Sequence, residues 1–225
     1  MTLLFLSLVL VAGGVSQVAL GVKEQDSTQR LLERKISRFE VVDALLRDGI
    51  SELSLTNIEG LHLGFEEIIR DKIQDDPRTS TAHFSLHLEE PTLGQVLDAL
   101  CQKDPRYIWS VDGSSINVYP RAAANEPSYL LDQRIQQIRL SGVPDPGQAL
   151  TLLSRLFPDQ QIGYFGGGDY SYAEPWTTVL ERLTVRQFIN RIAEHMGNNT
   201  VWVWQGGKDE RMFTFFRHGF HTFRP

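Results

Sequence analysis

The chain has 225 residues, of which 41% are hydrophobic and 22% charged, a composition typical of globular proteins with one or two domains. Its net charge of −6 and its scattered lysines and arginines argue against a nucleic-acid-binding protein, which normally carries a basic patch. The single cysteine, Cys101, excludes an intramolecular disulfide bond and falls on the apolar face of a predicted helix, where a thiol is usually a small buried side chain.

The N-terminal segment has the features of a secretory signal peptide. Residues 1–21 carry no charged side chain, and Leu3–Ala12 is almost entirely apolar. Ala19 and Gly21 place small side chains before a cleavage point, although the positive charge of a usual signal is missing. The run is shorter than the roughly 20 apolar residues that span a membrane. We therefore expect cleavage near Gly21 and a periplasmic or otherwise extracytoplasmic protein with no membrane span. A buried N-terminal helix or strand is the alternative.

The first half of the chain predicts a mixture of helix and strand. A polar lead-in, residues 22–38, comes first. Residues 39–47, FEVVDALLR, have apolar side chains at helical spacing and predict a helix that ends at Gly49. Residues 51–67 alternate between apolar and polar side chains over part of their length, which predicts short strands.

The segment that follows predicts a strand, a helix and a hairpin. Residues 84–88 alternate as a half-buried strand does. Thr92 is a good N-cap for an amphipathic helix. The apolar stripe of that helix is formed by Leu93, Val96, Leu97 and Leu100. Two strand-like runs then flank Asp112 and Gly113, so we expect a β-hairpin with its turn at these two residues.

The second half predicts the same order of elements after a linker at 121–128. Residues 146–157 predict an amphipathic helix and 161–165 a short strand. A further strand at 176–184 leads into a helix, and the two runs within 200–216 predict a hairpin with a longer loop.

The two helix–hairpin segments also match in detail. Thr184 stands where Thr92 stands, and Gln187 stands where Gln95 stands. Because the order helix, strand, strand, helix and hairpin recurs in both halves, we expect an internal duplication.

The segment 84–120, FSLHLEEPTLGQVLDALCQKDPRYIWSVDGSSINVYP, resembles the short N-terminal domain shared by secretins and TonB-dependent outer-membrane transducers. That domain combines a strand, a T-L-x-x-A/V-L-x-x-L helix and an aromatic-rich hairpin with a glycine in its turn. The matching residues are Thr92, Leu93, Val96, Leu97, Leu100, Tyr107, Trp109, Gly113 and Val118. Residues 176–216 resemble it more loosely, through Thr184, Val185, Phe188, Ile192, Trp202, Trp204 and Gly206.

The resemblance implies a periplasmic α/β module that docks to another protein and catalyses no reaction. In the family, these domains precede a membrane-embedded β-barrel and contact inner-membrane or signalling proteins. No barrel, plug or secretin core follows in this sequence, so we expect either a stand-alone periplasmic protein or one that meets its barrel, in a secretin- or TonB-like system, as a separate protein.

The residues themselves offer little sign of chemistry. The sequence lacks the G-x-S-x-G, P-loop, C-x-x-C and H-E-x-x-H motifs. The glycines of GGGDY, Gly166–Tyr170, lack the lysine and helix N-terminus of a phosphate site and predict a surface loop. His83 and His87 lie four residues apart on one strand, roughly 13 Å, so we expect these histidines and His62 to be solvated. We predict no catalytic residue, no metal site and no cofactor.

The second hairpin carries the strongest sign of a contact surface. Its first strand places Trp202 and Trp204 on one face and Val201 and Val203 on the other, so both faces are apolar. The second face predicts either packing between the two units or contact with a partner. In the second case Val201, Val203 and Trp109 are the candidate partner contacts.

Together these patterns predict an α+β protein made of two small βαββ-type units, each with helices on a short mixed sheet. The expected divisions are a signal peptide (1–21), a lead-in (22–38), a first unit (39–120, with the resembling segment at 83–120), a linker (121–128), a second unit (129–216) and a tail (217–225). The expected function is a non-enzymatic, exported protein-interaction module of a bacterial envelope assembly. The alternative is a periplasmic protein that binds a small ligand or glycan in a cleft between the units, stacked on Tyr164, Tyr170 and Trp176.

Overall fold

The computed structural model describes residues 29–56, 58–67, 83–165, 172–197, 199–206 and 211–217. The fold is α+β with mixed sheets, as the sequence predicts. In these described residues, no helix is long and apolar enough to cross a membrane. The predicted signal peptide, the GGGDY loop with Tyr170, and all of the tail after Arg217 lie outside them.

The first unit has the order β-α-β-β-α-β-β. Its elements are β1 (Arg38–Ala44), α2 (Leu46–Ser54), β2 (His62–Glu67), β3 (Phe84–Glu89), α3 (Leu93–Lys103), β4 (Tyr107–Asp112) and β5 (Ser115–Pro120). Strands β1 and β3 form an antiparallel pair, whereas the β4–β5 hairpin pairs through β5 with β2 in parallel. The unit is thus larger than the βαββ unit that the sequence predicts.

The second unit repeats this order after two short 3₁₀ turns, η1 (Ala123–Asn125) and η2 (Leu130–Asp132). Its elements are β6 (Arg134–Val143), α4 (Pro146–Leu156), η3 (Pro158–Gln160), β7 (Gly163–Phe165), β8 (Trp176–Thr184), α5 (Val185–Met196), β9 (Thr200–Gly206) and β10 (Arg211–Arg217). Here β6 pairs with β8, and the β9–β10 hairpin pairs through β10 with β7 in parallel.

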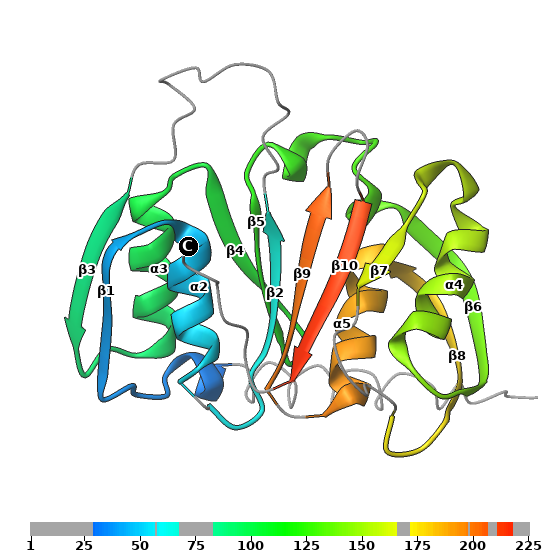
Figure 1. Ribbon diagram of the computed structural model, residues 1–225, viewed down its shortest axis with the longest axis horizontal. Helices are drawn as coiled ribbons and strands as arrows, with labels where there is room; N and C mark the ends of the chain where they lie inside the picture. The colour runs from blue at the N-terminus through cyan, green and yellow to red at the C-terminus, as the bar shows by residue number, and fades with distance from the viewer. Residues whose placement is uncertain are drawn as a thin grey trace, which may run out of the picture.

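The two units share one central sheet. It has six strands in the order β4-β5-β2-β9-β10-β7, so β2 of the first unit lies beside β9 of the second. Figure 1 shows five layers: β1 and β3, then α2 and α3, then the central sheet, then α5 and α4, and finally β6 and β8.

The second unit is turned over relative to the first. Strands β2 and β9 run parallel where the units meet, whereas β9 is equivalent to β4, which runs antiparallel to β5 and therefore to β2. A half turn about an axis that lies in the sheet and crosses its strands relates β4-β5-β2 of the first unit to β9-β10-β7 of the second. Such a rotation also exchanges the faces of the sheet, so the helices of the two units cover opposite faces.

The predicted helix at residues 39–47 is wrong, because strand β1 occupies most of this segment. Phe39, Val41 and Ala44 are buried, which is a strand alternation broken by one extra residue. That β-bulge lies between Val41 and Ala44, and it gives the apolar residues a spacing that resembles a helix. Gly49 lies inside α2 and does not end it: a Cβ there would lie 2.5 Å from Leu100 Cδ2, so the glycine lets α2 and α3 approach closely.

The same bulge occurs in the second unit, on β6. Asp43 in β1 and Gly142 in β6 both have positive φ, at 48° and 61°. The backbone N–H of Asp43 donates to Ser85 Oγ at 3.1 Å, and that of Gly142 donates to Thr177 Oγ1 at 2.9 Å. In both units, a hydroxyl on the neighbouring strand therefore satisfies the N–H that the bulge removes from the ladder.

Both hairpin-facing helices begin with a capping box, and Thr92 is the N-cap that the sequence predicts. Thr92 Oγ1 accepts from the Gln95 N–H while Gln95 Oε1 accepts from the Thr92 N–H. Thr184 and Gln187 make the same pair of bonds at the start of α5. The T-x-x-Q pattern thus sets the first residue of α3 and of α5 by the same chemistry.

Candidate functional site

Val201 and Val203 are buried inside the molecule, each 2% exposed, and so they offer no surface to a partner. Both side chains belong to the core of the first unit, beside the residues of β2. Trp202 and Trp204, on the opposite face of β9, belong to the core of the second unit. The two apolar faces of β9 therefore reflect packing between the units, the other of the two interpretations that the sequence left open.

Trp109 is half-buried on β4, the edge strand of the central sheet on the side of the first unit. Its indole N–H donates to Asp98 Oδ1 of α3 at 2.9 Å. Trp202 donates in the same way to Asn190 Oδ1 of α5, also at 2.9 Å. Trp109 thus ties its hairpin to its helix, and its role as a partner contact stays a prediction.

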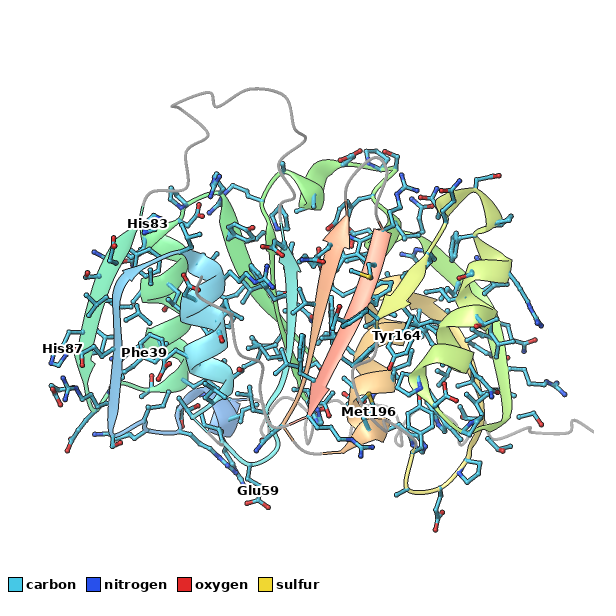
Figure 2. The ribbon with its side chains drawn as sticks, in the orientation of Figure 1. Phe39, Glu59, His83, His87, Tyr164 and Met196 are labelled. Carbon is cyan, nitrogen blue, oxygen red and sulfur yellow. The ribbon has the colours of Figure 1, made fainter. Side chains whose placement is uncertain are left out.

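The proposed ligand-stacking residues do not meet between the units. Trp176 stacks on His195 with ring centroids 4.8 Å apart. The ring centroids of Tyr164 and Phe215 lie 6.1 Å apart. Both pack against the core of the second unit, and Figure 2 shows Tyr164 between β10 and α4. Tyr170 lies outside the described residues.

The junction between the units begins with strand pairing. Five residues of β2, Leu63–Glu67, pair in parallel with Val201–Gln205 of β9. Gly64 makes room for this contact, since a Cβ there would lie 2.3 Å from the ring of Trp202. The second unit is therefore added to the first through an edge strand, with a large aromatic side chain seated over a glycine.

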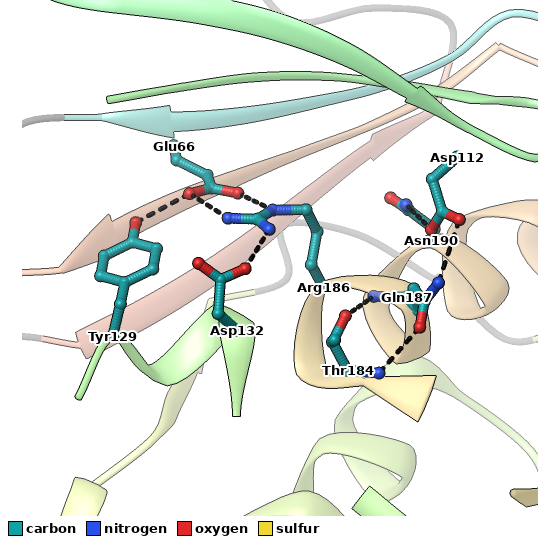
Figure 3. A network of polar contacts seen from close by, with 8 residues as sticks. All are labelled: Glu66, Asp112, Tyr129, Asp132, Thr184, Arg186, Gln187 and Asn190. Atoms are coloured by element: carbon teal, nitrogen blue, oxygen red, sulfur yellow. Dashed lines mark hydrogen bonds and ion pairs between the residues drawn. The ribbon is translucent and has the colours of Figure 1, made fainter. Parts of the chain in front are cut away.

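A buried ion pair crosses the junction (Figure 3). Glu66 of β2 is fully buried, and Arg186 of α5 donates to it through Nε at 2.5 Å and Nη2 at 3.2 Å. Tyr129 donates its hydroxyl to the same carboxylate at 2.8 Å, and Arg186 also donates to Asp132. The Arg186 guanidinium lies 4.5 Å from the centre of the Tyr119 ring, a cation–π contact with the first unit.

The electrostatics of this cluster favour a structural role. Burial raises the pKa of Glu66, and the hydrogen bonds from Arg186 and Tyr129 oppose that shift. Burial would lower the pKa of Arg186, but Glu66 and Asp132 raise it further than burial lowers it. The guanidinium therefore stays charged, and the Glu66 carboxylate already accepts three hydrogen bonds. Such a carboxylate has little capacity left to take a proton from a substrate.

Further polar contacts run along α5. Gln187 and Asn190 both donate to the carboxylate of Asp112 on β4, at 3.2 and 3.0 Å. Near the C-terminal end of the helix, Glu194 accepts a bond from Ser114 at 2.6 Å. Helix α5 thus lies across the back of the first unit's sheet and fixes its position by directional bonds.

Two hollows flank the start of α5, between the units. One has a volume of about 430 Å³ and is lined by Tyr119, Ala124, Glu126, Pro127, Asp132 and Arg186. The other has a volume of about 270 Å³ and is lined by Asp112, Leu180, Glu181, Arg182, Leu183, Gln187 and Arg191. A cleft between the units therefore exists, with a lining different from the one that the sequence predicts.

The histidines are placed partly as predicted. His83, directly before β3, and His87, on β3, are exposed, and Figure 2 shows both at the outside of the molecule. His62, by contrast, is 7% exposed on β2, so the expectation that it is solvated is wrong. In the part of the chain that the structure describes, no cluster of three or more metal-ligating side chains occurs. Burial raises the pKa of the Cys101 thiol to about 12, which makes it a poor nucleophile.

The sequence analysis missed Glu66 and Arg186, although one signal was present. Glu66 follows directly on the apolar residues of a predicted strand, a place where a charge needs a partner. Its partner lies 120 residues away, and only the pairing of β2 with β9 brings the two together.

Comparison of the chain with protein-family models, with curated proteins and with solved structures finds no match.

Proposed function

We propose that the chain is an exported, non-enzymatic protein-interaction module of a bacterial envelope assembly, with a role similar to that of the short N-terminal domains of secretins and TonB-dependent transducers. One observation carries this proposal. The chain itself joins one β-α-β-β-α-β-β unit to another by parallel strand addition, with a helix laid across the back of the acceptor sheet. A unit that already docks in this way has the means to dock to a further protein.

The chemistry of the described residues supports the same proposal. Of the charged side chains that the fold gathers across the junction, Arg186 pairs with both Glu66 and Asp132. They hold two protein surfaces in one orientation, which is a known use of buried ion pairs. The envelope location rests on the uncharged residues 1–21 and on the resemblance of residues 83–120.

In-cell crosslinking tests the proposal. A tagged full-length chain is crosslinked in the cells that produce it. The proteins attached to it are then purified from the envelope fraction and identified. We expect a mature chain that begins near Val22 in the extracytoplasmic fraction, with one dominant envelope protein attached. A chain that retains its N-terminal segment in the cytosol, or that recovers only itself, would contradict the proposal.

The cleft between the units supports a second candidate, a ligand-binding function. The larger hollow combines an aromatic ring, Tyr119, with hydrogen-bonding groups of Arg186, Asp132 and Glu126, as sites for sugars and other polar ligands do. A saturable rise in melting temperature with one class of compound, absent in a Tyr119→Ala variant, would favour this candidate. No rise with any class would leave docking as the function.

A further inference from the structure

Strand β7 holds in the second unit the place that β2 holds in the first. Each pairs in parallel with the second strand of its own hairpin, β7 with β10 and β2 with β5. The other edge of β2 is filled by β9, whereas β7 is the last strand of the central sheet among the described residues. The molecule therefore shows one completed junction and, at β7, an acceptor edge of the same kind.

The sheet face that β7 and β10 share at this edge carries two large apolar side chains, Met212 and Phe165, beside Thr214. Phe213 and Phe215 of β10 point into the core of the second unit, so Met212 and Thr214 point to the opposite face. By the same alternation Tyr164 packs on that core and Phe165 points away from it. Phe165 is 60% exposed, although it is a large apolar residue.

The completed junction shows what such a face meets. In the first unit the equivalent face carries Glu66, the residue after Phe65, and Arg186 of α5 lies against it. In the second unit Phe165 follows Tyr164 at that place. A partner unit that docks on β7 as the second unit docks on β2 would place its own helix against Phe165. The residue of that helix equivalent to Arg186 would therefore be apolar. Its edge strand would be apolar on both faces, as β9 is.

We propose that β7 is the docking edge for a further β-α-β-β-α-β-β unit, supplied by a partner protein, whose edge strand pairs in parallel with β7 and whose helix packs an apolar residue on Phe165. The inference rests on the proposed function and deepens it, because it names the surface and the kind of partner.

A second copy of this chain fits poorly as the occupant. It would have to offer β4, the equivalent of β9, and there Ser110 stands where β9 has Val203. Its helix α3 has Gly94 at the position of Arg186 and exposes Gln95 and Asp98. The helix therefore lacks the apolar side chain that Phe165 requires, and the strand lacks one of the four apolar residues of β9.

Site-specific photo-crosslinking in the native cells tests the inference. A photoreactive phenylalanine analogue replaces Phe165 in the full-length chain, and control chains carry it at Val42 of β1 or Val179 of β8, which are 60% and 44% exposed. We expect a crosslinked protein from position 165 only, with the crosslink mapped to an edge strand, or to the helix before it, in a unit of this strand order. When a tagged chain without the photoreactive residue is crosslinked chemically, Phe165→Glu should lower recovery of the same protein about tenfold at an unchanged melting temperature, and Val179→Glu should not.

The outcomes separate the two proposals. A partner captured from position 42 or 179 but not from 165 would overturn the inference and leave the docking function standing. A crosslink from 165 to another copy of the chain, or to any other kind of surface, would also overturn it. Capture of no protein from any position would contradict both.

Discussion

The substitution Arg186→Met tests whether the junction depends on its buried ion pair. Methionine keeps the unbranched stem of the side chain without the guanidinium, and it leaves Glu66, which is fully buried, with Tyr129 as its remaining side-chain donor. Breaking a buried pair by removing one partner typically costs about 3–5 kcal/mol, because the other charge stays buried. With a urea m-value of about 2 kcal/mol per molar, the unfolding midpoint should fall by about 2 M.

The loss should depend on pH in a defined direction. Burial raises the pKa of Glu66, and Arg186 supplies the positive charge that opposes this shift among the residues that the structure describes. The folded pKa of the variant then lies above the unfolded one, so the folded variant loses stability as pH rises through that interval. We expect Arg186→Met to differ little from the parent chain at pH 4 and most at pH 7, measured by urea unfolding followed by tryptophan fluorescence.

A double variant separates the charge from the packing. Glu66→Gln combined with Arg186→Met removes both charges, and an uncharged pair of similar volume is often neutral or stabilising. The double variant should therefore recover most of the stability that Arg186→Met loses. A loss under about 1 kcal/mol in the single variant at pH 7 would refute the reasoning, since so small a loss is typical of a solvated pair.

Other parts of the junction and its helix give further tests by the same unfolding measurement. Gly64→Ala places a Cβ 2.3 Å from the ring of Trp202 and should cost about 1–3 kcal/mol, whereas unchanged stability would mean that β2 and β9 are not in this register. Burial lowers the pKa of His62 below its ordinary value, against the opposing effect of Glu194, so the stability it contributes is complete above about pH 6.5 and declines as pH falls below it. His62→Gln should flatten that decline between pH 7 and 5, and an unchanged profile would assign the decline to other groups. Thr184→Ala removes the N-cap of α5 and should cost about 1 kcal/mol, restored in part by Thr184→Ser, and a cost near zero would argue against the capping box.

The sequence predicts α3 and α5 well because two independent signals agree there. An apolar stripe at helical spacing coincides with a T-x-x-Q capping box in each helix. The sequence pattern of β1 predicts a helix, which is wrong. The pattern of β6 predicts no element. Each strand contains a β-bulge, which shifts the phase of the alternation by one residue and hides the period of two on which strand prediction depends.

The junction is harder to predict than the elements that form it. Because both faces of β9 are apolar, the sequence indicates that each face packs against something. It does not say whether the second face packs on the other unit of this chain or on a partner protein. The partners of Glu66 lie 63 and 120 residues away, on segments whose meeting depends on the order of all six central strands. Pairwise contacts at such separation follow from topology, and a single sequence gives no direct evidence of it.

The two equivalent helices show how a junction changes the demands on one structural unit. Helix α3 buries four of its 11 residues, all apolar, and leaves its far side to solvent. Helix α5 buries seven of 12, including the polar Asn190, because it packs on its own sheet and on the back of its neighbour's. A helix between two units therefore needs apolar residues for one sheet and directional polar residues for the other. The polar set decides which neighbour fits, since an apolar face alone accepts many partners and an unpaired buried charge rejects almost all. By this reasoning the charged back of the first unit selects α5, whereas the back of the second unit, at Phe165, favours any helix that brings an apolar side chain to it and disfavours one with a buried charge there.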